Sequence, residues 1–235
     1  MREKMKNKKS IIIMIIIIVL ILALITAIFL YNKFQQDEVK KLTEEANKIL
    51  QQDFINDEID NKIKTKQNYA VVEKTIKEYI SNLKNIYLEI EELNSKVSAD
   101  EIFSAENLSD DKLEMVVDEY KQKSKENFEE IKKLEKEENI LEAINSTDIS
   151  SKRSYYVELY KTIMLSDSMK SKYQKIEEKA EKSKDKLYDN LTIVLNAKKY
   201  LDNHAKNWEI KDEKIVFKNP NTMIEYYNII NQIKS

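Results

Sequence analysis

The longest apolar stretch of the chain runs from Ile11 to Leu30, and Thr26 is its only polar residue. At about 1.5 Å of helical rise per residue, it covers roughly 30 Å, the hydrocarbon thickness of a bilayer. Hydrocarbon forces a lone segment to satisfy its own backbone hydrogen bonds as a helix, and core helices of soluble proteins seldom lack a polar face over such a length. The pattern predicts a transmembrane helix over residues 11–31, after a basic tail of residues 1–10.

A secretory signal peptide is the alternative interpretation of this region, because basic residues precede the apolar run. They are Arg2, Lys4, Lys6, Lys8 and Lys9. Signal peptides have an apolar region of about 7 to 15 residues and end at a small-x-small cleavage site. The run here is longer, and neither Ala23 nor Ala27 has a small residue two positions before it. We therefore expect the segment to stay in the protein as an anchor.

A second pattern begins at Val72, where apolar residues start to recur at alternating spacings of four and three. This seam consists of Val72, Ile76, Tyr79, Leu83, Ile86, Ile90, Leu93 and Val97. Such spacing holds one face of a helix against a partner helix, as in a coiled coil. The charged residues predicted to face solvent are Lys74, Lys77, Glu78, Lys84, Glu89, Glu91 and Glu92. The spacing favours a partner within the same chain and leaves pairing between two chains as the alternative.

Two further apolar stripes predict helices on either side of the seam. The stripe from Val39 to Ile49 continues the transmembrane helix outward. The stripe from Leu113 to Ile144 predicts another helix, which Ser109 or Asp110 could cap at its start.

The last long stripe runs from Leu159 to Leu201, with small and polar interruptions. An unbroken helix over residues 151–206 would extend roughly 80 Å. Ser166 is a suitable N-cap and could instead start a new helix at that point. We favour the continuous helix and keep the break as the alternative.

The segment after residue 206 has a different pattern. Residues 208–210 and 215–217 alternate as two short strands around a polar four-residue turn, residues 211–214. An isolated hairpin is marginally stable in water, so we expect it to pack on the bundle through Trp208 and Phe217. We interpret this unit as a structural cap, with a recognition surface as the alternative.

A final helix is predicted after Asn219-Pro220, because proline stops the second strand. Thr222 and Glu225 have the spacing of a capping box at its start. The residues predicted to form its apolar face are Met223, Tyr227, Ile230 and Ile233.

These elements predict a mainly α fold. Short polar connections near residues 65–68, 99–109 and 145–151 favour antiparallel neighbours. The chain has no glycine and one proline, which indicates few tight turns. We expect one N-terminal transmembrane helix, an elongated antiparallel helical bundle or coiled coil over residues 32–206, and a small C-terminal β-hairpin and helix over residues 207–235.

Composition argues against most catalytic chemistry. A chain without glycine has no glycine-rich phosphate loop and no dinucleotide fingerprint. His204 is the only histidine and cysteine is absent, so the usual zinc sites cannot form. The acidic runs at residues 57–60 and 110–111 lack calcium-loop spacing and are interpreted as solvated faces. We expect a protein that is not an enzyme, and we assign no catalytic, cofactor-binding or metal-binding residues.

Charge indicates how the chain is oriented. The basic tail is richer in Lys and Arg than the region just after the span, so we expect a cytoplasmic N-terminus and an extracytoplasmic domain at the cell membrane. The whole chain has 40 basic and 42 acidic residues, without the basic excess that a nucleic-acid partner requires.

The expected function is that of a single-pass, membrane-anchored scaffold, spacer or protein-docking module of the cell envelope. Its expected partners are the lipid bilayer, through Ile11 to Tyr31, and a protein whose identity the sequence does not indicate. A homo-oligomer is a further alternative. The alternative functions are a ligand-sensing or small-molecule-binding ectodomain that works with a partner and, less favoured, a membrane-tethered hydrolase.

Overall fold

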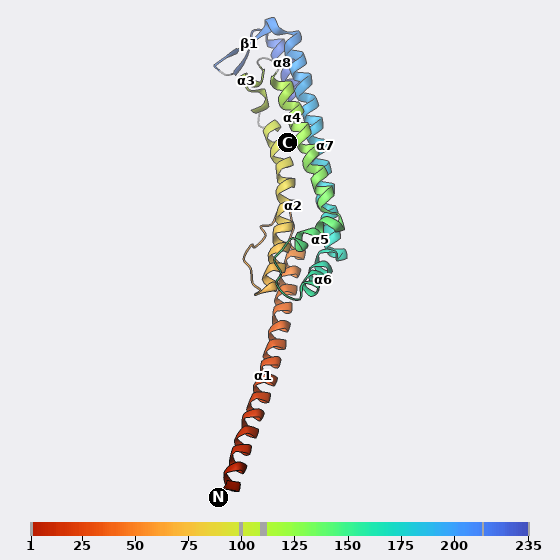
Figure 1. Ribbon diagram of the computed structural model, residues 1–235. Coiled ribbons are helices and arrows are strands. Elements are labelled where there is room, and N and C mark those ends of the chain that lie inside the picture. Colours follow the sequence, from red (N-terminus) through yellow and green to blue (C-terminus); the bar gives the residue numbers. More distant parts are fainter. Residues whose placement is uncertain (1, 99–100, 109–111, 213, 235) are drawn as a thin grey trace.

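The computed structural model describes residues 2–98, 101–108, 112–212 and 214–234. Its longest element is α1 (Arg2–Gln51), a single helix whose N-terminal part stands alone outside the bundle (Figure 1). The side chains from Val19 to Tyr31 are all exposed. By length and composition α1 is able to cross a membrane, so it is a candidate membrane anchor or signal sequence.

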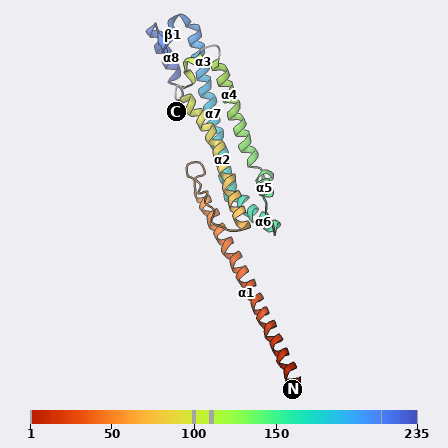
Figure 2. The same cartoon turned by 60° about the vertical axis from the view of Figure 1, so that its left-hand side comes forward.

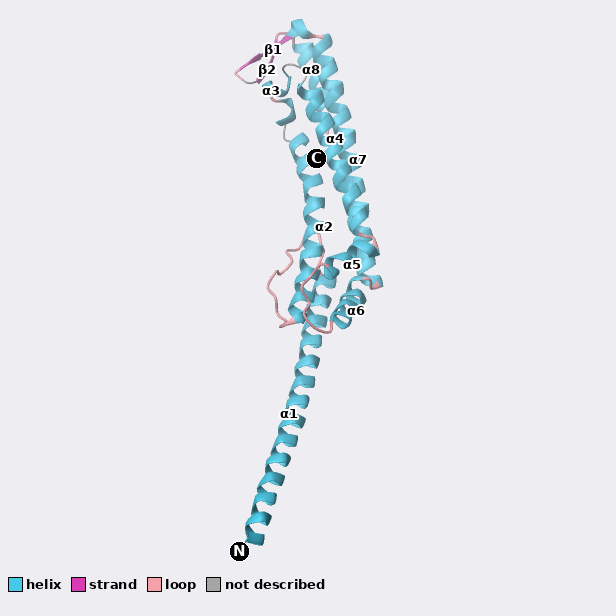
Figure 3. Ribbon diagram, in the orientation of Figure 1, coloured by secondary structure: helices cyan, strands magenta, loops and turns pink. Residues whose placement is uncertain are grey.

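The outer part of α1 continues the apolar helix into the bundle, as predicted. Leu42, Ala46 and Ile49 are buried there, and α1 packs against α2 (Asn68–Ser98). The connection that was expected only near residues 65–68 is longer. It is an irregular loop over residues 52–67, which lies along the lower half of the bundle (Figure 3).

Three long helices form the shaft of the molecule: α2, α4 (Lys112–Leu134) and α7 (Asp167–Asn203). They lie side by side in both views (Figures 1 and 2). Every residue of the predicted seam is buried except Ile86, which is half-buried. Since α2 packs on α4 and α7 of its own chain, the seam is used within one chain.

Two of the predicted helices are divided. The stripe from Leu113 to Ile144 ends one helix at Leu134 and starts α5 (Glu137–Asn145) after a short interruption. Tyr79 Oη donates to the carbonyl oxygen of Leu134, which satisfies an acceptor at this helix end. The predicted caps Ser109 and Asp110 lie outside the described residues.

The favoured unbroken helix over residues 151–206 is wrong. The structure has α6 (Arg153–Met164) and then α7, which begins at the N-cap Ser166. The Ser166 hydroxyl accepts a hydrogen bond from the Met169 amide at 3.3 Å. A side-chain cap therefore outweighs the periodicity at this point, and α6 folds back against α5 and α2.

The buried apolar residues form two clusters along the shaft. The membrane-proximal cluster runs along α2 as far as Ile90, and the distal cluster starts at Leu93. At their boundary the buried Asn94 amide donates to Ser183 Oγ and to the Ser183 carbonyl oxygen, both at 2.9 Å. A polar contact between α2 and α7 thus separates the two cores.

Short elements close the distal end, which Figure 3 shows opposite the N-terminus. They are η1 (Glu101–Phe103), α3 (Ala105–Leu108), η2 (Ala205–Asn207), β1 (Trp208–Lys211), β2 (Lys214–Phe217) and α8 (Pro220–Ile230). The strands pair antiparallel with Lys211 opposite Lys214. The hairpin is confirmed, but its turn has two residues instead of four, and Asp212 has a left-handed φ of 51° there.

α8 is present, but its predicted start and apolar face are wrong. The N-cap is Asn219, whose side chain accepts from the Asn221 amide at 2.9 Å, so the helix starts before the expected capping box. Thr222 and Tyr226 face the bundle, whereas Met223 and Tyr227 are exposed. Hydrogen bonding and aromatic packing against the hairpin determine which face of α8 is buried.

Candidate functional site

Hydrogen bonds hold the hairpin and the C-terminal segment firmly on α7. Trp208 Nε1 donates to the Leu201 carbonyl oxygen at 2.7 Å, and Asn207 Nδ2 donates to Thr222 Oγ1 at 3.2 Å. Beyond α8, the buried Asn190 side chain makes two hydrogen bonds with the Lys234 backbone, at 3.0 and 2.9 Å. The cap is therefore a fixed platform, although its elements are short.

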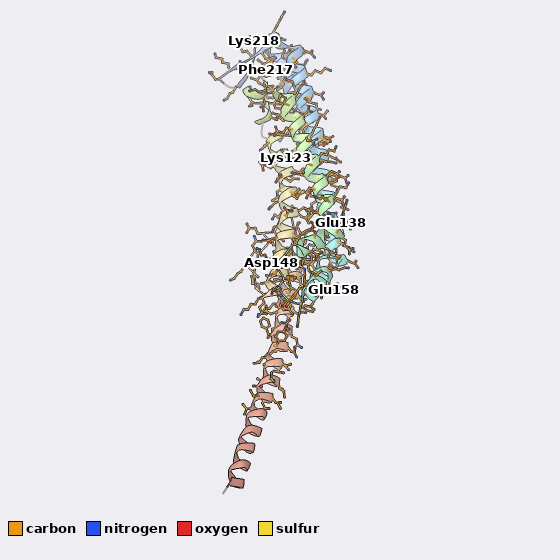
Figure 4. The ribbon with its side chains drawn as sticks, in the orientation of Figure 1. Lys123, Glu138, Asp148, Glu158, Phe217 and Lys218 are labelled. Carbon is orange, nitrogen blue, oxygen red and sulfur yellow. The ribbon has the colours of Figure 1, made fainter. Side chains whose placement is uncertain are left out.

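Aromatic rings form the core of this cap. Tyr226 contacts Phe103 edge to face at a centroid distance of 6.0 Å and Phe217 at 5.3 Å. Tyr227, the next residue of α8, lies 6.3 Å from Phe217. Figure 4 places Phe217 at the end of the molecule farthest from the N-terminus. The rings join η1, β2 and α8 into one unit.

An open hollow of about 420 Å³ lies between these elements. Its apolar lining comprises Phe103, Ile215, Tyr226, Tyr227 and Ile230, and Ser104 and Lys214 add polar groups. We call this set the cap surface. It combines an apolar floor with a few polar groups, as small docking sites for protein side chains do.

Apolar side chains around the hollow face solvent. Tyr227 is 47% exposed, and Met223 and Ile224 on the same helix are also exposed. Tyrosine is enriched among the residues that dominate binding energy at protein interfaces. The nearby ion pair between Lys218 Nζ and Glu209 Oε2, at 2.7 Å, adds a polar margin on the hairpin. The cap surface thus resembles the core and rim of an interface.

A second unusual feature is a buried ion cluster where α1 enters the bundle. Lys77 is only 2% exposed, which contradicts its predicted solvent position. Its Nζ lies 2.7 Å from Glu73 Oε1 and 3.3 Å from Glu45 Oε2 of α1, and it donates to the Lys62 carbonyl oxygen at 2.8 Å. The cluster ties α1, α2 and the 52–67 loop together.

Buried carboxylates hold the backbone of that loop. Glu73 accepts from the Thr65 amide and from Thr65 Oγ1, both at 2.8 Å, and Glu38 accepts from the Lys66 amide at 2.6 Å. Burial acts to raise the pKa of Glu73, but the hydrogen bonds from Lys77 and Thr65 outweigh it and lower the pKa overall. Glu73 is therefore an ionised structural group.

Another acidic group lies at the break between α4 and α5. Burial, together with the charge of and a hydrogen bond with the neighbouring Glu177 carboxyl, raises the pKa of Glu135 to about 8. The same carboxyl faces the buried Tyr79, and burial raises the pKa of that phenol as well. Glu135 thus holds a proton at neutral pH in the folded protein.

The remaining sequence candidates have structural positions. His204 ends α7: its Nδ1 lies 2.9 Å from the Tyr200 carbonyl oxygen, and its ring stacks on that of Tyr200. Asp57, Glu58 and Asp60 are exposed, as predicted, and residues 110–111 lie outside the described part. Within the described residues, no group of three or more His, Cys, Asp or Glu side chains is placed to hold a metal ion.

Sequence reasoning missed the ion cluster, although a signal for it was present. Ile80 and Tyr87 are apolar and each follows a seam residue, so they widen the apolar stripe toward the flank that carries Glu73 and Lys77. A wider stripe indicates a second helix on that flank. Glu73 and Lys77 are also spaced as an i,i+4 ion pair.

No known protein family, no curated protein and no solved structure matches this chain.

Proposed function

We propose that this protein is a non-enzymatic, single-pass membrane spacer that carries a protein-docking surface at its distal cap. The basic tail orients the cap outside the cytoplasm. The observation that carries the proposal is the cap surface, an apolar-lined hollow with the exposed Tyr227, held rigidly at the end of the bundle farthest from α1. The partner is a protein of the cell envelope that inserts apolar side chains into this hollow.

The arrangement of α1 supports the spacer role. The helix enters the bundle without a break, and the buried contacts of Glu45 and Lys77 fix it there. A flexible linker would let the domain lie in any direction, whereas a continuous helix transmits the direction of the anchor to the bundle. The cap surface is then held at a defined height above the bilayer.

Site-specific photocrosslinking in intact membranes tests the docking role. A photoreactive phenylalanine analogue replaces Tyr227, and the same analogue replaces Leu88 as the control, because Leu88 is exposed on the side of α2. We expect one discrete protein adduct from position 227, which disappears when Ile215→Asp is added, and no such adduct from position 88. Equal adducts from both positions, or no adduct from position 227, would refute the proposal.

Thiol labelling tests the orientation, and the absence of native cysteine makes it clean. A cysteine placed at Ser235 is expected to react with a membrane-impermeant reagent on intact cells, and a cysteine at Met5 to stay unlabelled. The reverse pattern would overturn the extracytoplasmic location of the cap.

A further inference from the structure

The base of the bundle reaches down to the level at which α1 leaves the apolar run. Lys152 Nζ donates to Tyr31 Oη at 2.9 Å and lies 5.0 Å from the centroid of the Tyr31 ring. Tyr31 directly follows the last residue of the apolar run, Leu30. The connection between α5 and α6 therefore lies beside the end of the hydrophobic segment, and it is not held high above it.

A tyrosine cluster fixes this arrangement one helical turn further out. Tyr69 of α2 donates to Gln35 Oε1 at 2.6 Å, and its hydroxyl lies 3.3 Å from Tyr155 Oη of α6. The Tyr69 ring also packs edge to face on Tyr156, at 5.0 Å between centroids. Gln35 is about 6 Å along the helix from Tyr31, so the starts of α2 and α6 both lie within one turn of the apolar boundary.

The backbone at this base adopts a costly conformation. Gln67 and Lys152 have left-handed φ values of 54° and 49°, which non-glycine residues disfavour. They precede α2 and α6, and Asn68 Nδ2 links the two segments by donating to the Ser151 carbonyl oxygen at 3.1 Å. Such conformations persist where surrounding contacts enforce them and often accompany function. Here they place the exposed side chain of Lys152 against Tyr31.

Charge and aromatic content at the base match a lipid headgroup layer. Lys33, Lys66 and Lys152 are exposed, and so is Tyr155, with Asp37 and Asp148 as the exposed acidic residues in the same segments. The headgroup region extends about 5 to 8 Å beyond each face of the hydrocarbon. Tyrosine and lysine are the residues that anchor membrane proteins in this layer.

We infer that Tyr31, Lys33, Lys66, Lys152 and Tyr155 form a juxtamembrane collar that binds the phosphates of anionic lipids in the bilayer that α1 spans. This inference rests on the anchor role of α1 in the proposed function. A tilt of α1 brings the collar onto the headgroups, and lysines near an anionic surface each favour the docked state about five-fold. The collar sets the angle at which the spacer leaves the membrane.

The test uses the full chain inserted in phosphatidylcholine vesicles, with and without one third phosphatidylglycerol. A fluorophore on Ser151→Cys reports on the base, and the same fluorophore on Asn221→Cys reports on the cap. The quencher is a lipid spin-labelled on its headgroup. We expect quenching at position 151 that rises several-fold with phosphatidylglycerol, and little quenching at position 221 in either vesicle.

The double substitution Lys66→Gln and Lys152→Gln is expected to return quenching at position 151 to the level in neutral vesicles. Lys199→Gln, an exposed lysine of α7, is the matched control and is expected to change nothing. Equal quenching at positions 151 and 221, or quenching unaffected by phosphatidylglycerol or by the double substitution, would overturn the collar. A chain that fails to float with the vesicles would instead overturn the anchor itself, and with it the proposed function.

Discussion

The membrane-proximal and distal halves of the bundle treat polar and apolar side chains in opposite ways. The proximal half surrounds α2 with the outer part of α1, α5, α6 and α7, and it buries even the charged Glu73 and Lys77. The distal half closes with short elements and leaves Met223 and Tyr227 of α8 exposed. Buried charges require fixed partners, whereas exposed apolar groups are available to bind. The contrast supports a proximal half that fixes the anchor and a distal half that presents a surface.

The largest effect is expected in the core of α2. Leu83 is fully buried and Leu88, in the same helix, is 41% exposed. Leu83→Asp is expected to lower the free energy of unfolding by about 4–5 kcal/mol, because an unpaired charge would be buried, and Leu88→Asp by less than about 1 kcal/mol. Urea unfolding of the detergent-solubilised chain, followed by circular dichroism, measures both.

Sedimentation of the same samples tests which partner the seam has. We expect the wild type to sediment as a monomer. A wild-type dimer that Leu83→Asp separates into folded monomers would contradict packing of the seam within one chain.

The ion cluster is expected to give the next largest effect. Lys77→Met leaves Glu73 and Glu45 buried without their cation, which is expected to cost about 3–4 kcal/mol of unfolding free energy. Lys74→Met is the control, because Lys74 and its partner Glu78 are both exposed and such pairs contribute little. Similar losses for the two variants would show that the cluster does not hold α1 on the bundle.

The proximal half also predicts two opposite pH dependences. The lowered pKa of Glu73 gives stability that is present above its ordinary value of 4.5 and is lost as pH falls below it. The raised pKa of Glu135, about 8, gives stability that is full below pH 4.5 and is lost as pH rises through 8.

Glu135→Gln isolates the alkaline effect. Since the carboxyl is only partly buried, we expect the variant to gain about 1 kcal/mol over the wild type at pH 9 and almost nothing at pH 5. Glu138→Gln on the exposed face of α5 is the matched control. Thermal unfolding at the two pH values provides the measurement, and an equal gain at both would contradict a proton held by Glu135.

The smallest effect on stability is expected at the cap. Tyr227→Ser removes a half-exposed ring and is expected to cost at most about 1 kcal/mol of unfolding free energy. The same substitution is expected to abolish the crosslink formed through a photoreactive residue at Met223. Loss of the fold in this variant, or an unchanged crosslink, would remove the distinction between the two halves.

The sequence predicted those features that depend on periodicity. The apolar run, the outward continuation of α1, and the seam of α2 all rest on repeated spacing, and the structure places each in a helix. The breaks after Leu134 and before Ser166 were not settled, because one hydrogen bond at a helix end decides them. Periodicity averages over many residues and does not resolve such single contacts.

Tertiary contacts explain the other differences. The exposed face of α8 was predicted as its buried face, because Met223 and Tyr227 are apolar. Tyr226 is buried instead through its rings against Phe103 and Phe217. Lys77 was assigned to solvent by its charge, although α1 covers it. The cap surface could not be anticipated, since its lining comes from three segments far apart in the chain.

The height of the cap above the bilayer tests the spacer account most directly. Trp208 is the only tryptophan of the chain and lies in the cap. α2 starts level with Gln35 and has 31 residues, so Trp208 is expected roughly 50 Å above the membrane surface. We predict that tryptophan emission of the inserted chain shows no energy transfer to dansyl-labelled headgroups. Strong transfer would mean that the bundle lies flat on the membrane, which would contradict a spacer that holds its docking surface away from the bilayer.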